Sequence, residues 1–494
     1  MQSSLMPQSP TEWLPENHLA FFILEILDQL DVSAIERKVQ STDPRGERPY
    51  SPRMMTALLL YGYTVGVFSS RKIEQATHGD VAFRVLAAGD HPHFTTINSF
   101  RDDHREALAG LFQRVLELCM SAGLVKLAHV AIDGTKMKAN ASKHKAMSAE
   151  RMETAERQLT DEIESLLSKA EAVDAAEDAE YGVGNPEPGL KAEWARREGR
   201  REKIREHLAA LKKEAASGRA EVLREQADAL RRTSTSVDPK ITSKTKAAAK
   251  TLATKRDVQA NLLDPIERDS DDDDPPPPPV DADLPRHKPP TTRDGKPTPK
   301  AQRNFTDPES RIMFRDGAFV QAYNGQIAVD ESHQIIVAAA LSNQGPDTEY
   351  LQPMLNRVVK NCGQVPEKAT ADSGYFSVEN VRHAEHLGVE PFIAASRHRR
   401  DGAPGDDSPL ENLATPERAA MRALLETSYG RNAYARRKAT VEPVFGQIKW
   451  ARGFRQMSFR GIAKNRLEWL FVALTHNLRK LWRYAPQRRA LQTA

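Results

Sequence analysis

The sequence predicts a mixed α/β protein preceded by an all-α N-terminal region. Residues 17–125 are almost entirely helical in pattern, with apolar residues at helical spacing. Further along the chain, three strand-like segments come first, and strands then alternate with helices. That order is typical of a mixed sheet with helices packed on it. At 494 residues the chain is long enough for about two to four domains.

The N-terminal region shows the start signals of several helices. His18–Leu30 is apolar at helical spacing, and Ser51 followed by Pro52 predicts the start of a helix through Val67. A Ser-capped helix ending near Gly79 comes next, and then a helix over 94–118. Short helices joined by turns are compatible with a helix-turn-helix, although the bare pattern favours an ordinary helical bundle.

Five segments after residue 126 read as strands and separate into two groups. In chain order they are 127–133, 319–330, 333–341, 368–372 and 389–394. Helices are expected at 348–359 and 378–387, and again towards the C-terminus after a polar loop at 397–411. Because the first strand lies far from the other four, the sheet must be interrupted by an insert.

The insert has two parts of different composition. Residues 148–170 and 204–230 place Ala, Leu, Ile and Met on one helical face among alternating charges, which predicts a charged helical hairpin. Residues 233–303 are rich in Thr, Ser, Lys and Pro, with an acidic run at 271–274 and five prolines at 275–279. This composition predicts an extended, disordered linker.

Charge and cysteine content limit the kinds of partner and the cellular compartment to be expected for this chain. The net charge of +3 is uninformative, but the chain from Arg431 to its end has fifteen Lys and Arg against two acids. Such an excess favours a polyanionic partner. Two cysteines without a disulfide or zinc pattern indicate a reducing cytosol, and no apolar stretch is long enough to span a bilayer. We expect a soluble cytoplasmic protein.

Three acids occupy positions suited to a metal centre. Asp133 and Asp372 each end a predicted strand and precede a glycine by one or two residues, and Glu442 lies on a helix among cations. Acids at strand ends of such sheets point into the ligand-binding crevice. Breaking a phosphodiester requires an activated nucleophile and neutralised charge, which two Mg²⁺ ions held by carboxylates provide. The three acids therefore predict metal-dependent phosphodiester chemistry.

The chain resembles the DDE-type transposases of bacterial insertion sequences, specifically the family numbered eleven eighty-two. The segments that carry the resemblance span most of the ordered sequence: PYSPRMMTALLLYGYTVGVFSSRKIEQA, FTTINSFR, VAIDGTKMKANAS, NFTDPESRIM, QAYNGQIAVDESHQIIVAA, ATADSGYFS and VEPVFGQIKWARGFRQMSFRG. The resemblance implies an RNase H-like catalytic core interrupted after its first strand by the insert. It also implies that Asp133, Asp372 and Glu442 are the catalytic, metal-binding triad for two Mg²⁺ ions, with Mn²⁺ as an alternative.

Related transposases carry Tyr, Arg, Glu and Lys on the last catalytic helix. Here Tyr434, Arg437, Glu442 and Lys449 fit that pattern, with four rather than three residues between the Arg and the Glu. Glu442 and Lys449 are seven residues apart, which places them on one face of a straight helix. We expect DNA contacts from a set of cations near the triad: Lys136, Arg437, Lys449, Arg452 and Arg455.

The resemblance implies these domains: a helical DNA-binding domain at 1–125, the first strand of the core at 126–145, the hairpin at 146–232, the linker at 233–303, and the remaining core with basic helices at 304–494. The expected partners are the terminal inverted repeats of the element and target DNA, with a homo-oligomer pairing two ends. The expected localisation is the bacterial cytoplasm, in association with the nucleoid. Three alternatives remain open: a non-catalytic DNA-binding descendant, a general RNase H-like nuclease and a structural coiled-coil protein.

Overall fold

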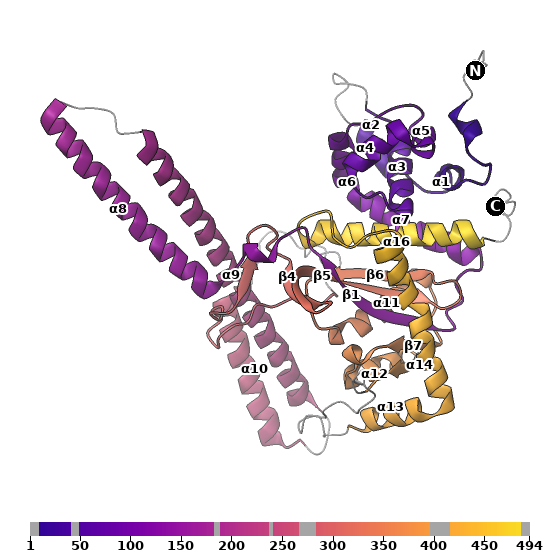
Figure 1. The fold of residues 1–494 in the computed structure, drawn as a ribbon. Helices are drawn as coiled ribbons and strands as arrows, with labels where there is room; N and C mark the ends of the chain where they lie inside the picture. The colour runs from indigo at the N-terminus through magenta and orange to yellow at the C-terminus, as the bar shows by residue number, and fades with distance from the viewer. Residues whose placement is uncertain are drawn as a thin grey trace, which may run out of the picture. The chain divides into compact units, whose positions relative to one another are not determined.

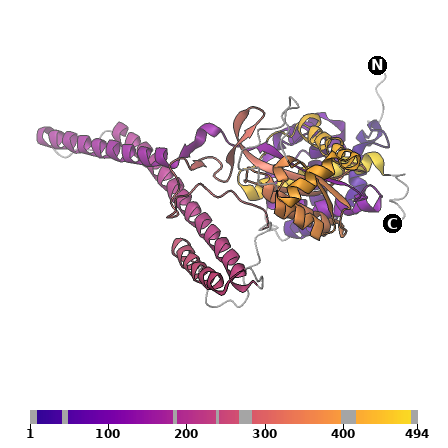
Figure 2. The same ribbon diagram turned by 90° about the horizontal axis from the view of Figure 1, so that it is seen from below.

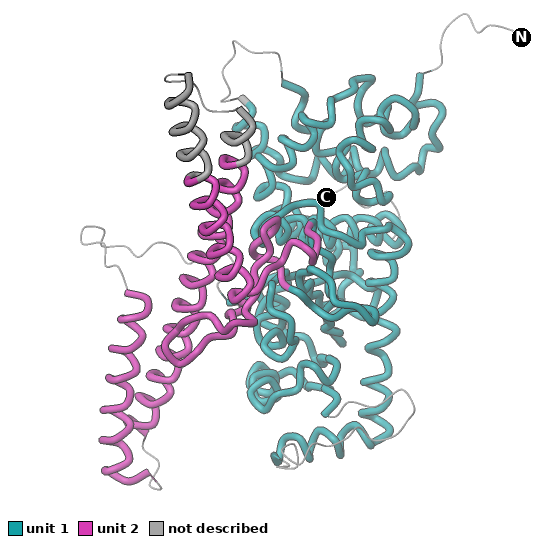
Figure 3. The backbone as a smooth tube through the Cα atoms, turned by 60° about the vertical axis from the view of Figure 1, so that its left-hand side comes forward, with its two compact units in different colours: residues 1–140, 281–285, 312–494 teal, residues 141–280, 286–311 magenta. Residues whose placement is uncertain are grey.

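The computed structural model describes residues 9–40, 49–181, 188–236, 241–265, 283–395 and 415–485. The chain forms two compact units, shown in Figure 3. Unit 1 comprises residues 1–140, 281–285 and 312–494, and unit 2 comprises residues 141–280 and 286–311. The acidic and proline run at 271–279 and the polar loop predicted at 397–411 lie outside the described residues.

Unit 1 begins with a bundle of short helices. After a 3₁₀ turn at Pro10–Trp13, the helices are α1 (Leu19–Leu27), α2 (Ser33–Gln40), α3 (Pro52–Val65), α4 (Ser70–Gly79), α5 (Val81–Leu86), α6 (Phe94–Asp103) and α7 (Arg105–Ser121). Pro52 is the first residue of α3, as predicted, but the Ser51 side chain makes no capping hydrogen bond. The predicted helix over 94–118 is broken at His104, which has φ −111° and ψ 15°.

The rest of unit 1 is a six-stranded mixed sheet with helices packed on it. The strands are β1 (Val130–Lys138), β4 (Arg311–Arg315), β5 (Ala318–Asp330), β6 (Ile336–Ser342), β7 (Lys368–Ala371) and β8 (Glu390–Ile393). Their order is β4-β5-β1-β7-β8, and β6 also pairs with β5. β1 is antiparallel to β5 and parallel to β7, so it lies at the centre of the sheet, where the two kinds of pairing meet. The predicted mixed α/β architecture is confirmed.

The remaining helices of unit 1 lie between the later strands and after the last one. They are α11 (Leu351–Cys362), α12 (Val378–His386), α13 (Pro416–Glu426), α14 (Ser428–Thr440), α15 (Glu442–Gly446) and α16 (Ile462–Tyr484), with a π-helical turn at Gln447–Ala451 and 3₁₀ turns at Thr348–Tyr350 and Ser373–Tyr375. α16 packs against β6 and α7, and α11 packs against β5 and β6 (Figure 1). The Trp469 indole lies against Gly325 and donates to the Gln326 carbonyl at 3.1 Å. Odd-numbered residues of β5 therefore face α16, since neighbours along a strand point to opposite faces.

Unit 2 is built on long helices. α8 (Ala149–Tyr181) and α9 (Pro188–Thr235) lie side by side in Figures 1 and 2. The apolar cluster between them includes Met152, Leu159, Ile204 and Leu208. Ion pairs join Arg197 to Glu162, Arg205 to Glu156 and Lys212 to Glu153. As the residue number of the cation rises along α9, the residue number of its partner acid falls along α8. The two helices are therefore antiparallel, as in a helical hairpin.

The segment expected to be a disordered linker contains regular structure. Ser243–Leu263 forms α10, which packs on α9, so the prediction is wrong there. The reason is a stripe of small residues: Ala249, Ala253 and Ala260 are buried, and Ala260 packs with Ala220 and Leu223 of α9. A two-stranded sheet of β2 (Ala146–Ser148) and β3 (Gln302–Asn304), with a 3₁₀ turn at Lys143–Lys145, completes the unit. No described helix of either unit is both long and apolar enough to cross a membrane.

Candidate active site

The register of β1 and β7 brings two of the three predicted acids level with each other. Val130 pairs with Ala369 and Ala131 with Thr370, in parallel. Continuing that register by two residues sets Asp133 beside Asp372, which directly follows the last residue of β7. The two carboxylates interact electrostatically, since Asp372 raises the pKa of Asp133. Two acids more than two hundred residues apart in the sequence thus lie on neighbouring strands.

The strand that carries Asp133 does not end there. β1 continues to Lys138, so the prediction of a strand-terminal acid is wrong for Asp133. Gly134 is not at a turn but pairs with Gln326 within the sheet. Asp372 does follow its strand, and its side chain accepts a hydrogen bond from the Gly374 backbone at 2.8 Å. The sequence analysis ended the strand at Asp133 because the apolar run stops there. The residues that follow, Gly-Thr-Lys-Met-Lys, are mostly polar and are equally compatible with a loop.

Asp133 is an acid in a strongly perturbed setting. Burial raises the pKa of its carboxyl to about 6, and the charges of Asp372 and Asp347 add to the rise. Arg437 and the Gly134 N–H, which donates to Asp133 at 2.8 Å, oppose it. Burial wins because only 17% of the side chain is exposed and few waters can solvate the charge. Perturbed carboxyls of this kind are concentrated at functional sites.

Arg437 joins the acids through one guanidinium. Its Nη1 donates to Asp133 at 3.0 Å, and its Nη2 lies 3.6 Å from Glu442. Burial works against the charged guanidinium, but the charges of Asp133, Tyr434, Asp372 and Glu442 outweigh it and raise the pKa of Arg437. Its buried Nε has no hydrogen-bond partner. The Tyr434 ring lies 5.9 Å from the guanidinium, so the Tyr, Arg and Glu of the sequence pattern meet here.

Glu442 begins a helix rather than continuing one. α14 ends at Thr440 and α15 starts at Glu442, so the helical run is interrupted one residue before the acid. The Glu442 side chain is 53% exposed, far more than Asp133. Among the described residues, no three His, Cys, Asp or Glu side chains lie close enough together to hold a metal ion. The triad residues share one neighbour, Arg437, but they are not assembled as a ligand set.

Lys449 approaches the same strand from the π-helical turn. Its ammonium donates to the hydroxyl of Thr135, two residues beyond Asp133 on the same face of β1. Burial, with the nearby charge of Arg315, lowers the pKa of Lys449 to about 8. A π turn widens the helix by one residue and is common at functional sites. The straight-helix spacing assumed from the sequence therefore does not describe how Lys449 reaches the site.

The residues present fit a divalent cation in their chemistry. Asp133, Asp372 and Glu442 offer carboxylate oxygens, which Mg²⁺ prefers. Burial is the main cause of the raised pKa of Asp133, and repulsion by the Asp372 carboxylate adds to it. A cation bound between them would relieve that repulsion. Arg437 now supplies positive charge to Asp133, and a metal bound there competes with that ion pair.

Two further cations predicted to contact DNA differ in position. Arg452 is 4% exposed and donates to Thr475 at 2.9 Å and to the Val472 carbonyl at 3.2 Å. Its guanidinium holds the C-terminal helix, so the prediction that it contacts DNA is wrong. Arg455 is exposed and lies over the Trp450 ring at 3.9 Å, and Trp450 is itself 68% exposed. This pair remains a candidate surface for nucleic acid.

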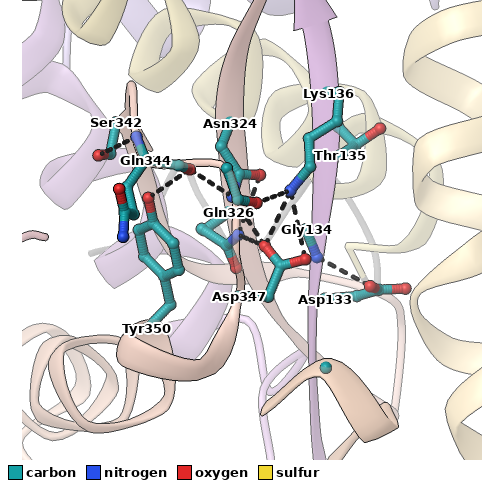
Figure 4. A network of polar contacts seen from close by, with 12 residues as sticks. Asp133, Gly134, Thr135, Lys136, Asn324, Gln326, Ser342, Gln344, Asp347 and Tyr350 are labelled. Atoms are coloured by element: carbon teal, nitrogen blue, oxygen red, sulfur yellow. Dashed lines mark hydrogen bonds and ion pairs between the residues drawn. The ribbon is translucent and has the colours of Figure 1, made fainter. Parts of the chain in front are cut away.

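One acid of this region escaped the sequence analysis. Asp347 lies beside β1 and accepts hydrogen bonds from Lys136, Asn324 and Gln326 (Figure 4). It follows a Gly-Pro turn, where an Asp reads as an ordinary helix cap. The signal that could have revealed it is the pair of amides, Asn324 and Gln326, on one face of a mostly apolar, buried strand. Buried amides need polar partners.

Comparison with protein families gives two matches at opposite ends of the chain. Residues 8–103 match a transposase domain, DUF772, and residues 409–482 match a transposase DDE domain. Glu442, Arg437 and Lys449 lie within the second match, whereas Asp133 and Asp372 lie outside both. No curated protein and no solved structure matches the chain. The similarity to these two families, with an α/β sheet that brings Asp133 and Asp372 together, supports a DDE transposase of an insertion sequence.

Proposed function

We propose that this protein is a transposase of the insertion-sequence family numbered eleven eighty-two, with an RNase H-like core. It binds the terminal inverted repeats of its element and cuts the DNA by metal-dependent phosphodiester hydrolysis. It then transfers the freed 3′-hydroxyl ends to target DNA. The N-terminal helical region binds the element ends, and two copies of the chain pair them. The protein acts in the cytoplasm, on the nucleoid.

The observation that carries this proposal is the convergence on Arg437. A single guanidinium lies within electrostatic reach of Asp133, Asp372 and Glu442, which come from three separate parts of the chain. A helix-surface ion pair does not require a largely buried acid on β1 and a second acid directly after β7 as well. A site that handles a dianionic transition state and metal ions does.

Asp133, Asp372 and Glu442 would hold two Mg²⁺ ions. When bound, such ions lower the pKa of water and stabilise both the attacking and the leaving oxygen of a phosphodiester. The remaining work belongs to the chain. Arg437 and Lys449 hold the DNA phosphates next to the acids, and the exposed Arg455 extends this cationic track. Burial of Lys449 against Thr135 limits its rotamers and fixes where the phosphate sits.

The experiment compares Asp133→Asn and Glu442→Gln with the wild type on DNA that flanks the coding sequence of this chain. Wild type should cut this DNA in the presence of Mg²⁺, whereas both variants should bind it with nearly unchanged affinity and cut nothing. If either variant cut at the wild-type rate, the assignment of the triad would fail.

A general nuclease on the same core would give a different result. It would also lose activity in both variants, but it would cut unrelated duplexes as well as the flanking DNA. A transposase should cut only at the ends of its element and should join the freed 3′ ends to a second DNA molecule. The joined product therefore separates the two functions.

A further inference from the structure

Helix α10 of unit 2 carries an excess of cations that its own acids do not balance. Ser243–Leu263 contains four lysines and one arginine but a single acid, Asp257. Asp257 forms an ion pair with Arg231 of α9, and the next acid along the chain, Asp264, lies 3.7 Å from Arg224 of α9. Both acids are therefore used against α9, and the exposed surface of α10 is positively charged.

Packing on α9 presents these cations in a fixed array. Figure 1 shows α10 alongside α9, and the buried alanines of α10 turn one side of it inwards. Lys244, Lys250 and Lys255 are exposed, and among the described residues none of the three has an ion-pair partner. Lys244 and Lys255 are about three turns apart, so they lie on one side of the helix, about 17 Å from each other. Lys246 and Lys250 line a groove of about 500 Å³ between α10 and the end of α9.

The residues between these lysines suit contact with a phosphate backbone rather than with bases. From Thr245 to Thr254 the helix contains only Ala, Thr, Leu and Lys. None of these side chains has the amide or guanidinium fork that makes bidentate contacts with base pairs. Lysine binds phosphate as a point charge, and such contacts carry no sequence information. A duplex has one negative charge for about every 1.7 Å of its axis, so it offers phosphates along the whole segment.

The exposed apolar side chains of α10 would suit a protein partner instead. They are Leu252, Val258 and Leu262. Val258 and Leu262, the two most exposed at 57% and 79%, both follow Lys255. The segment from Lys244 to Lys255 therefore presents mainly cations, and charge complementarity favours a polyanion as its partner.

We propose that α10 is an accessory DNA-binding helix, on which Lys244, Lys250 and Lys255 bind backbone phosphates of a DNA duplex irrespective of its sequence. This surface goes beyond the proposed function, which assigns DNA contacts to residues of unit 1 alone. The three acids of the proposed metal centre also belong to unit 1. Binding of a duplex by α10 therefore does not require that those acids cut DNA.

The test measures binding of the full-length protein to a fluorescently labelled duplex of arbitrary sequence over a range of salt concentrations. Lys244→Gln, Lys250→Gln and Lys255→Gln are combined, because glutamine has nearly the helix propensity of lysine but no charge. Each phosphate contact contributes about 0.9 to the slope of log affinity against log salt, so the slope should fall by about 2 to 3. At about 0.1 M salt, the triple variant should bind at least tenfold more weakly.

A matched triple variant removes three cations of unit 2 that already have acid partners. Arg205, Lys212 and Lys288 each form an ion pair with a glutamate. Replacing all three by glutamine changes the net charge of the chain by the same amount. This control should keep the wild-type salt slope. An equal fall of the slope in the control would mean that the total charge of the protein, rather than α10, attracts DNA, and would overturn the proposal.

An unchanged salt slope in the α10 variant would also overturn the proposal. Sedimentation velocity would then show whether the same variant alters self-association, which would assign this face to a second copy of the chain. The proposed function fails separately. Asp133→Asn should abolish cutting and keep the wild-type salt slope on this duplex. If the wild type neither cut nor joined DNA, the proposed function would be lost, while the salt slopes would still report on α10.

Discussion

Asp133→Asn should stabilise the protein while it abolishes activity. Burial of the ionised carboxylate raises the pKa of Asp133 from 3.8 to about 6. At about 1.4 kcal/mol for each pKa unit, the ionised carboxylate costs the folded state about 3 kcal/mol. A neutral amide of the same shape avoids this cost. The raised value already includes the attraction of Arg437, so the burial cost outweighs the ion pair that the substitution removes.

The sign of the effect depends on pH. Because the pKa of Asp133 is higher in the folded state than in the unfolded chain, folding is favoured by protonation. Below about pH 4 the carboxyl is protonated in both states, and the variant should gain nothing. The cost builds up as the pH rises from about 4 to about 6, where the unfolded chain is ionised and the folded protein still holds the proton. Above about pH 7 the full difference of about 3 kcal/mol should separate the two proteins.

Urea unfolding of unit 1 measures this difference. The chain has five tryptophans, of which only Trp194 lies in unit 2, so a Trp194→Phe background makes the fluorescence report on unit 1. Trp469 is buried in that unit and supplies the main signal. Mg²⁺ should stabilise the wild type more than the variant. If the stability advantage of Asp133→Asn over the wild type were no larger at about pH 8 than at about pH 4, the reasoning from burial would be refuted.

Three further predictions concern neighbouring positions. Burial lowers the pKa of Lys449 to about 8, so the affinity of the protein for DNA should fall as the pH rises through that value. Lys449→Arg should remove this pH dependence. An unchanged pH dependence in the variant would contradict the role given to Lys449. Gly134→Ala should lower the free energy of unfolding by about 1–3 kcal/mol by overpacking, whereas Gly110→Ala, at an open helical position, should raise it by about 0.5–1 kcal/mol; urea unfolding distinguishes them. Arg452→Met should cost about 1.5–3 kcal/mol of stability without changing the DNA affinity of the folded protein. Arg455→Ala should weaken DNA binding and leave stability unchanged. Weaker DNA binding by a stable Arg452→Met variant would instead support the prediction that Arg452 contacts DNA.

The pattern of apolar residues in the sequence was sufficient to predict the mixed α/β architecture. The strands at 319–330, 333–341 and 368–372 were predicted within a few residues of β5, β6 and β7, because buried strands read as continuous apolar runs. The helix over 378–387 was predicted as well, since Ser377 caps it through its side chain. These features depend on local sequence. The end of β1 does not, because pairing with β5 carries the strand past Asp133.

The environments of several residues depend on tertiary contacts that the sequence pattern does not reveal. Arg452 looks like its exposed neighbours in a basic segment, and only the fold shows that its guanidinium is buried on α16. Asp347 reads as a turn residue, and only the pairing of β1 with β5 brings Lys136 and two amides to it. α10 has the composition of a linker, but three of its alanines are buried and Ala260 packs with Ala220 and Leu223 of α9. In each case the partner lies far away in the sequence.

The central claim is that Asp133, Asp372 and Glu442 form one metal centre. Fe²⁺ in place of Mg²⁺ reduces added hydrogen peroxide to hydroxide and a hydroxyl radical, and ascorbate returns the Fe³⁺ to Fe²⁺. The radicals cut the backbone near a bound ion, and mass spectrometry locates the cuts. On the DNA-bound protein we predict cuts in all three segments, next to β1, β7 and α15, that excess Mg²⁺ suppresses and Glu442→Gln abolishes. Cuts confined to one segment, or a pattern that Glu442→Gln leaves unchanged, would contradict the claim.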